Sequence, residues 1–488
     1  MNQTSPRSIE AMGAINRVVP YPRAEDDDQV LSVSEHGTDL DASLRFAEAH
    51  ARQLRYCPGV GWLAWDKRRW AVEGDGRAVQ LSMQSARRWT EKWSRCGGDG
   101  REQRVKTALS LESASHIEAT VRLAKCNPLL VVTVASLDRD PWMLNVLNGT
   151  LDLRTGKLRP NNRTDLSTKL APVEFDPSAQ HVALTRYLKT CEAATPGMGA
   201  FLARCFGAAL TGDASAETLF LLQGAGGSGK TTLIEAVSAM LGDYAVKLSF
   251  ESFCQSKHGR SPGAASPDLI RLRGSRLAYA SEGDQSARLD AGVVKTLTGN
   301  EPITARALYA PPITFPQTWK LWLVSNFDPK ADSEDSGIWR RMLKLHFDAI
   351  PETQRDPSVK RTLIEDPAAR SSLLAWLVAG CLDWQARGGG RIGLCPPDSV
   401  QQVTDAYRCK QDTLAEWWDD LLAGDAELLP LEMTPVGALR RHYEEWCAEN
   451  GAMEVYVKRF NSYLETKGLE KRRGTGGAKR WHGIKLTK

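Results

Sequence analysis

A glycine-rich octapeptide in the middle of the chain carries the strongest chemical signal. It matches the pattern GxxxxGK(S/T) in full, with the residues Gly224, Ala225, Gly226, Gly227, Ser228, Gly229, Lys230 and Thr231. An apolar run of strand type precedes it over 218–222, and an apolar stripe at helical spacing follows it. Strand, loop and helix in this order predict a phosphate-binding loop, whose backbone N–H groups and helix N-terminus attract phosphate. Lys230 is expected to reach the β- and γ-phosphates of ATP and Thr231 to bind Mg²⁺, with Thr232 completing the nucleotide-binding set.

Two further apolar strands are expected to end in polar residues. One runs from Arg276 to Glu282, and the other from Lys320 to Asn326. A carboxylate such as Glu282 can hold Mg²⁺ and polarise water, whereas the Asn326 amide can orient the attacking water and sense the γ-phosphate. A lone Glu at a strand end is weak evidence by itself, so the order of the motifs carries the prediction.

Arg340 and Arg341 stand just before the apolar run 342–347. An arginine supplied by a neighbouring subunit can stabilise the charge of a phosphoryl-transfer transition state by a factor of about 10³–10⁵. The alternative for two adjacent arginines is an ordinary surface salt-bridge pair.

In order and spacing, these motifs resemble the superfamily 3 DNA helicases, specifically the helicase half of the phage- and plasmid-type primase–helicase family. The residues that carry the resemblance are Gly224–Thr231, Leu277–Glu282, Lys295–Gly299, Ile303–Tyr309, Leu321–Asn326 and Trp339–Arg341. The stretch 144–153 also looks like the domain that precedes the motor in this family.

The resemblance implies an AAA+-like α/β P-loop ATPase core that assembles into a ring, expected to be a hexamer, with ATP between subunits. Lys230, Glu282 and Asn326 would act on the phosphates and water, and Arg340 or Arg341 would reach the neighbour's site. Lys295 and Arg306 would face DNA in the pore. Ser281 stands where many such strands carry a first acid, which leaves Thr231 with waters, or Asp284, to complete the Mg²⁺ contact.

The C-terminal end is basic. Residues 457–488 hold ten Lys/Arg and two Glu, a charge of +8, whereas the whole chain carries +4 and the remainder therefore −4. Two expected helices and a glycine-tipped hairpin are typical of a winged helix, and this module is similar to the C-terminal module of the same family. The residues expected to contact DNA are Lys458, Arg459, Arg472, Arg473, Lys479 and Arg480. A solvated basic tail is the alternative that charge alone leaves open.

Composition and breaks in the pattern give the domain organisation. The chain has 488 residues, 42% hydrophobic and 25% charged, which is an ordinary globular balance. We expect a disordered leader (1–41), an α+β pre-helicase domain (42–200), the ATPase domain (201–387), a linker with an acidic helix (388–430) and the winged helix (431–488). The longest apolar run, Leu373–Leu382, is too short to cross a bilayer. Scattered cysteines and the absence of a signal-like segment favour the bacterial cytosol.

Three alternatives to a DNA helicase of a phage, prophage or plasmid-like element remain. A primase–helicase would need a priming domain, for which only Asp138-Arg139-Asp140 has suitable acidic spacing. An origin-binding initiator could use ATP only as an assembly switch. A different AAA+ translocase is the third. A separate primase or polymerase is a further expected partner of the helicase.

Overall fold

The computed structural model describes residues 37–95, 97, 100–255, 267–281, 287–306, 308, 312–332, 335–450, 452, 454–473 and 478–487. Packing divides the chain into two units, Met1–Leu54 with Gly74–Val131, and Arg55–Glu73 with Val132–Lys488. This division differs from the expected single domain over 42–200, because the tryptophan-rich hairpin and everything after Val131 pack within the second unit. Residues 1–36 of the expected leader lie outside the described part.

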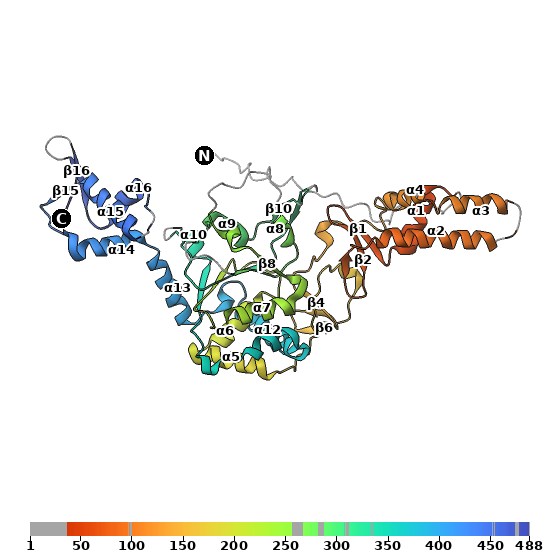
Figure 1. The fold of residues 1–488 in the computed structure, drawn as a ribbon, viewed down its shortest axis with the longest axis horizontal. Helices are drawn as coiled ribbons and strands as arrows, with labels where there is room; N and C mark the ends of the chain where they lie inside the picture. The colour runs from red at the N-terminus through yellow and green to blue at the C-terminus, as the bar shows by residue number, and fades with distance from the viewer. Residues whose placement is uncertain are drawn as a thin grey trace, which may run out of the picture. The chain divides into compact units, whose positions relative to one another are not determined.

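The first unit is helical where it is described. Its helices are α1 (Asp39–His50), α2 (Arg77–Arg95), α3 (Arg101–Ser110) and α4 (Ala114–Ala124) (Figure 1). Thr38 caps α1 because its Oγ1 accepts a hydrogen bond from the Asp41 N–H at 3.2 Å. Ordered structure therefore starts slightly before the expected boundary at residue 42. Phe46 and Trp93 are buried inside this unit.

A five-stranded parallel sheet forms the centre of the second unit. In spatial order its strands are β13 (Met342–His346), β7 (Leu219–Gln223), β12 (Lys320–Ser325), β9 (Leu277–Ser281) and β8 (Ala245–Leu248). Every neighbouring pair is parallel. All five carboxyl ends therefore lie at one edge of the sheet, and all amino ends at the other. The strands that the sequence predicts before the phosphate-binding loop, before Glu282, before Asn326 and after Arg341 are confirmed.

Both faces of this sheet are covered, as is usual for parallel sheets. On one face the sheet packs against α6 (Met198–Ala208), α7 (Lys230–Leu241) and α12 (Pro367–Ala386). Trp322 is fully buried there and stacks on Phe206 and Phe220, with ring centroids 3.9 and 4.1 Å apart. On the other face, Leu219 and Leu221 join a cluster with side chains of α9 (Ala291–Thr298) and α13 (Asp398–Lys410). Successive side chains of β7 thus point to opposite faces of the sheet and join two separate apolar cores.

Two smaller antiparallel elements precede the parallel sheet in the chain. One is a tryptophan-rich hairpin, formed by β2 (Gly61–Trp65) and β3 (Trp70–Val72). The other consists of β4 (Met143–Val146), β5 (Gly149–Asp152) and β6 (Lys157–Arg159).

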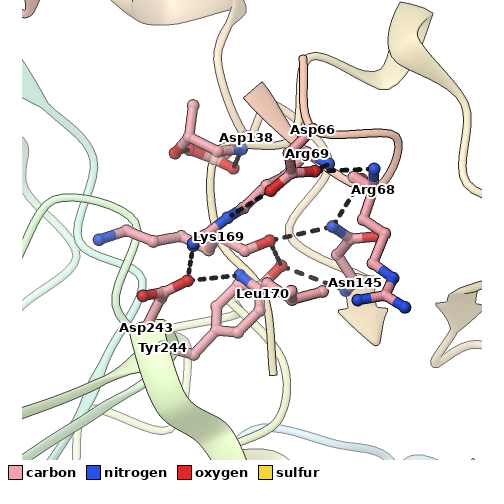
Figure 2. Close-up of polar contacts among 10 residues, drawn as sticks. Asp66, Arg68, Arg69, Asp138, Asn145, Lys169, Leu170, Asp243 and Tyr244 are labelled. Atoms are coloured by element: carbon pink, nitrogen blue, oxygen red, sulfur yellow. Dashed lines mark hydrogen bonds and ion pairs between the residues drawn. The ribbon is translucent and has the colours of Figure 1, made fainter. Parts of the chain in front are cut away.

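A polar network joins these elements to the end of α7 (Figure 2). Asp243, just after α7, accepts a hydrogen bond from the Leu170 N–H at 3.0 Å and forms an ion pair with Arg69 of the hairpin turn. The Asn145 side-chain amide donates to the carbonyls of Arg68 (2.9 Å) and Lys169 (3.1 Å). These hydrogen bonds fix the hairpin and β4 against the turn that follows α7.

The C-terminal module has a core of its own. It contains α14 (Thr413–Asp420), α15 (Val436–Asn450) and α16 (Val457–Thr466), with an antiparallel sheet in the order β15 (Met433–Pro435), β17 (Lys479–His482) and β16 (Glu470–Arg473). Trp417 of α14 packs against Tyr443 and Phe460, each at 5.3 Å between ring centroids. The acidic helix therefore belongs to this module. The expected boundary at 430 differs from the structure. The charged residues beside the tryptophans of α14 made its buried face hard to recognise in the sequence.

The close contact between α6 and α12 gives a prediction about stability. A Cβ on Gly380 would lie 2.1 Å from the Ala203 carbonyl oxygen. Gly380→Ala should therefore force the helices apart and lower the free energy of unfolding by about 1–3 kcal/mol. Gly437→Ala is a matched control, because that helical glycine has no neighbour within 4 Å of the added Cβ. Chemical denaturation of both variants measures the difference, and equal stability would contradict the close packing.

Candidate functional site

The glycine-rich loop lies at the carboxyl edge of the sheet, between β7 and α7. Gly229 caps α7 with φ of 87°, a left-handed conformation that glycine adopts without strain. Gly224 has φ of 155°, and a Cβ there would lie 2.1 Å from the Phe347 carbonyl oxygen. Gly226 instead faces open space. The loop is thus held tightly at both ends and is open in the middle, where a ligand would approach.

Lys230 is buried within this loop and is 4% exposed. Its Nζ donates to the carbonyls of Gly224 (2.6 Å) and Ala225 (2.9 Å), and lies 3.1 Å from both Ser228 Oγ and Asn326 Oδ1. Burial lowers the pKa of Lys230. The structure therefore brings together the predicted lysine and the predicted asparagine, although 96 positions separate them in the chain.

Four oxygens surround Lys230 Nζ, two from loop carbonyls, one from the Ser228 hydroxyl and one from the Asn326 amide. A lysine in this position, at the N-terminus of a helix, could donate to an anion in their place. Thr231 is exposed and Thr232 is half-buried on the first turn of α7. Glu282 and Asp284 lie outside the described residues. The strand that leads to Glu282 ends at Ser281, which pairs with Val324 of β12.

A cavity of about 210 Å³ adjoins the loop, and the sequence analysis did not identify it. Its lining includes Tyr187, Cys191, Met198, Ser228, Phe347 and Ile350. The Tyr187 hydroxyl, on α5 (Val182–Ala194), donates to the Gly229 carbonyl at 3.3 Å. Burial raises the pKa of Tyr187 and raises that of Cys191 to about 11, so both are neutral at pH 7. The pocket is mostly apolar and adjoins the loop through Ser228.

Arg355 is a second residue that the sequence analysis missed. Its guanidinium lies against the loop, with Cζ 2.6 Å from the position that a Cβ on Gly227 would take. The Arg355 Nε donates to the Ile350 carbonyl at 2.8 Å. This arrangement places a cation beside the loop from the same chain. No motif at 355 signals it, because the contact depends on how the chain turns after β13.

The two adjacent arginines have different surroundings. Arg341 is 7% exposed, and its guanidinium donates to Glu217 Oε2 at 2.9 Å and to the Gly337 carbonyl at 3.0 Å. The Arg340 side chain is 67% exposed and lies 4.0 Å from the same carboxylate. Arg341 therefore stabilises the fold, whereas Arg340 projects into solvent.

Arg340 is also distant from the loop of its own chain. It precedes β13, which runs parallel to β7 with Met342 opposite Leu219 and His346 opposite Gln223. The length of β7 thus separates Arg340 from the loop, about 16 Å at 3.3 Å per residue. Arg340 cannot reach phosphates bound to its own loop.

The residues predicted to face DNA in the pore have separate positions. Lys295, on α9, donates to Asp335 Oδ2 at 2.8 Å, and this hydrogen bond is the main cause of a lowered Asp335 pKa. Asp335 also caps α10 (Ser336–Trp339). Arg306 is exposed and follows β10 (Ile303–Ala305), which forms a hairpin with β11 (Ile313–Phe315). The structure does not bring Lys295 and Arg306 into one described contact.

Four of the six predicted basic residues of the C-terminal module lie opposite one another on β16 and β17. Arg472 faces Arg480, and Arg473 faces Lys479. Like charges at directly opposed positions are unfavourable, and Glu470 on the same strand offsets part of this charge through its ion pair with Arg472, whose Nε donates to Glu470 Oε2 at 2.9 Å. On α16, Lys458 is exposed, whereas Arg459 forms a 3.5 Å ion pair with Asp332.

Within the described ranges, no group of three or more His, Cys, Asp or Glu side chains could hold a metal ion. Among the same residues, the helices are all too short or too polar to span a bilayer.

Comparison with known proteins gives two family matches. Residues 43–207 match the family described as D5 N terminal like, and residues 222–341 match a family of unknown function, DUF5906. The "Putative helicase L207/L206" of Acanthamoeba polyphaga mimivirus is 28% identical, over 59% of this chain and 31% of its own length. The "Putative primase C962R" of African swine fever virus is also 28% identical, over 58% of this chain and 31% of its own length.

Each match covers part of the chain, and these relatives carry the names putative helicase or putative primase. The "Putative helicase 022R" of frog virus 3 agrees, at 29% identity over 47% of this chain and 25% of the viral protein. The chain thus corresponds to about a third or less of each relative. A solved structure of the NrS-1 C-terminal region covers 64% of this chain and 78% of its own, with 11% identity and a TM-score of 0.40, a likeness too distant to carry an argument.

The contrast between the two arginines gives a second prediction. Arg341→Ala should lower the free energy of unfolding by about 1–3 kcal/mol, because it leaves Glu217 and the Gly337 carbonyl without their partner. Arg340→Ala should change it by less than about 0.5 kcal/mol, as for other exposed residues. Thermal unfolding of both variants measures the contrast. Similar losses of unfolding free energy in both variants would show that Arg341 does not stabilise the fold more than Arg340 does.

Proposed function

We propose that this chain is an ATP-dependent DNA helicase that works as an oligomeric ring, expected to be a hexamer, in the replication of a phage, prophage or plasmid-like element. The contact between Lys230 Nζ and Asn326 Oδ1 carries the proposal. It supports a site for the γ-phosphate and attacking water between the carboxyl ends of β7 and β12. The family matches and the names of the relatives support nucleic acid as the substrate.

In this proposal the loop and α7 bind the phosphates of ATP. Backbone N–H groups of the loop and the N-terminus of α7 donate to the phosphate oxygens. Lys230 Nζ exchanges its loop carbonyls for the β- and γ-phosphates, and the nucleoside occupies the pocket beside Tyr187. Thr231 and Glu282 would hold Mg²⁺, which would supply positive charge to offset that of the triphosphate. Asn326 orients the attacking water, and Glu282 accepts the proton that this water loses.

Hydrolysis would need a second subunit. Negative charge develops on the transferred phosphoryl group, and a positioned cation stabilises it. Arg340 is exposed at the amino edge of the sheet, where a neighbour's loop could meet it, and Arg341 anchors the backbone next to it. This division of roles assigns the trans-acting function to Arg340. Arg355 would add charge from the same chain as the loop.

DNA would be held at two places. The three helices and basic three-stranded sheet of the C-terminal module support a winged helix that contacts duplex phosphates through Arg472, Arg473, Lys479 and Arg480. Arg306, at the end of β10, supports a contact with a single strand in the pore. Lys295 would contact DNA only by exchanging its ion pair with Asp335.

The second candidate is an origin-binding initiator that uses ATP as an assembly switch. The basic strands β16 and β17 favour it, since duplex binding alone would satisfy their charge. Asn326 and Arg340 argue against it, because ATP binding without hydrolysis requires neither.

The central test compares ATP hydrolysis, with and without single-stranded DNA, and unwinding of a forked duplex. The wild-type chain should show DNA-stimulated hydrolysis and strand separation. Lys230→Ala should lower kcat by about 10²–10³, as expected when a phosphate ligand is lost. Lys247→Ala, an exposed lysine on β8, is the matched control and should retain activity. Specific duplex binding by wild type with negligible turnover would instead establish the initiator.

A mixing experiment tests the shared site. Arg340→Ala alone should lose about 10³-fold in kcat while still binding ATP. Mixing it with Lys230→Ala should restore part of the activity, because some interfaces then combine an intact loop with an intact Arg340. The controls are Arg340→Ala alone and Lys230→Ala alone, each assayed at the same total protein concentration as the mixture. Absence of recovery, with mixed assembly demonstrated, would refute action in trans.

A further inference from the structure

A polar cavity of about 520 Å³ lies in the second unit, away from the phosphate-binding loop. Arg276 reaches it from the amino end of β9, and Tyr244 reaches it from the turn after α7. The remaining wall comes from the segment before β4 and from the region of β5 and β6. The loop and this cavity therefore adjoin opposite edges of the same parallel sheet.

Arg276 is the unusual member of the lining. It is 2% exposed, and within the described residues its Nε and Nη1 have no hydrogen-bond partner. Gly212 leaves space for the guanidinium, since a Cβ there would lie 1.5 Å from Nη1. Burial lowers the pKa of Arg276, but nearby Tyr244, Asp138 and Asp140 oppose the shift, and arginine stays charged in proteins. A buried cation with unfilled donors is costly unless an acceptor reaches it.

The carboxylates of the lining already have partners. Arg154 binds Asp140 with two hydrogen bonds of 3.0 and 3.1 Å. Asp138 accepts from the Thr168 N–H at 2.7 Å and from its hydroxyl at 2.5 Å. Arg159 pairs with Asp165 at 2.9 Å. The two ion pairs neutralise Asp140 and Asp165, whereas Asp138 keeps its charge because Thr168 is a neutral donor. Arg276 and exposed Arg139 therefore face only Asp138, and the lining carries a net charge of +1.

We propose that this cavity binds a phosphomonoester group, carried by a free nucleotide or by the phosphorylated end of a strand. Nε and Nη1 of Arg276 are fully buried, with Nη1 against Gly212, so the guanidinium would meet a phosphate oxygen through Nη2, and Arg139 contributes a second positive charge at the rim. The volume suits a nucleotide-sized ligand. The assignment of the phosphate to a nucleotide or strand rests on the proposed function, whereas the presence of an anion site does not.

The test uses the full chain carrying Lys230→Ala, so that the phosphate-binding loop does not dominate binding. Isothermal titration with dTMP measures the free nucleotide. Fluorescence anisotropy with short labelled thymidine strands, with and without a 5′-phosphate, measures the strand end. Arg276→Gln should weaken binding of the preferred probe at least about tenfold, and Arg139→Gln about threefold. Lys157→Gln, an exposed residue of β6 outside the lining, should leave affinity unchanged.

Each outcome decides the proposal. Preference for dTMP identifies a free nucleotide, and preference for the 5′-phosphorylated strand over the 5′-hydroxyl strand identifies a strand end. Undetectable binding of all probes overturns the proposal. So does an affinity for the preferred probe that stays equal to that of the parent Lys230→Ala chain in both Arg276→Gln and Arg139→Gln. If Arg276→Gln fails to fold in thermal unfolding, Arg139→Gln decides. Failure of ATP hydrolysis with intact Lys230, alongside Arg276-dependent binding here, would refute only the helicase.

Discussion

The parallel pairing of β7 with β12 is the constraint on which the candidate site depends. Because Ser325 lies opposite Gln223, the residues that follow these strands emerge side by side. Lys230 and Asn326 meet only for this reason. Because β13 is parallel to β7, the residues that precede β13 lie at the opposite edge of the sheet, and Arg340 is one of them. In the proposed function, one chain would therefore carry two halves of a site that face away from each other, and assembly of several copies would bring such halves together.

The amino edge of the sheet holds several buried cations, each accommodated differently. Arg341 is paired with Glu217, and Lys320 donates to the carbonyl and hydroxyl of Thr211 at 2.8 and 3.1 Å. Burial lowers the pKa of Lys320 to about 7, with nearby Arg276 adding to the shift. Lys320 can therefore reduce its cost by losing a proton, whereas Arg276 cannot. This difference is why an external anion suits Arg276 better than Lys320.

The sequence predicted the elements that local patterns determine. It did not predict the contacts that form only when distant segments of the chain come together in the fold. The apolar strands, the glycine-rich loop and the helices of the C-terminal module each have a periodic signal within a few residues. Arg355 and Tyr187 have none, because they meet the loop only after the chain has formed α5 on one side and turned beyond β13 on the other. Likewise, the sequence indicated that Arg340 or Arg341 would act, and only burial separates them. The assignment of Trp417 to the C-terminal core also required the packed fold.

The helix α7 connects the phosphate-binding loop to the polar network around Asp243. Its twelve residues span about 18 Å, and a helix of this length moves as a rigid rod. Lys230 begins α7, and the ion pair of Asp243 with Arg69 lies just beyond its end. Any shift of the loop would therefore either reach that network or be absorbed by the loop itself. The loop would absorb such a shift most easily at Gly227 and Gly229. Both glycines are in the left-handed conformation, and their backbone rotates without side-chain strain.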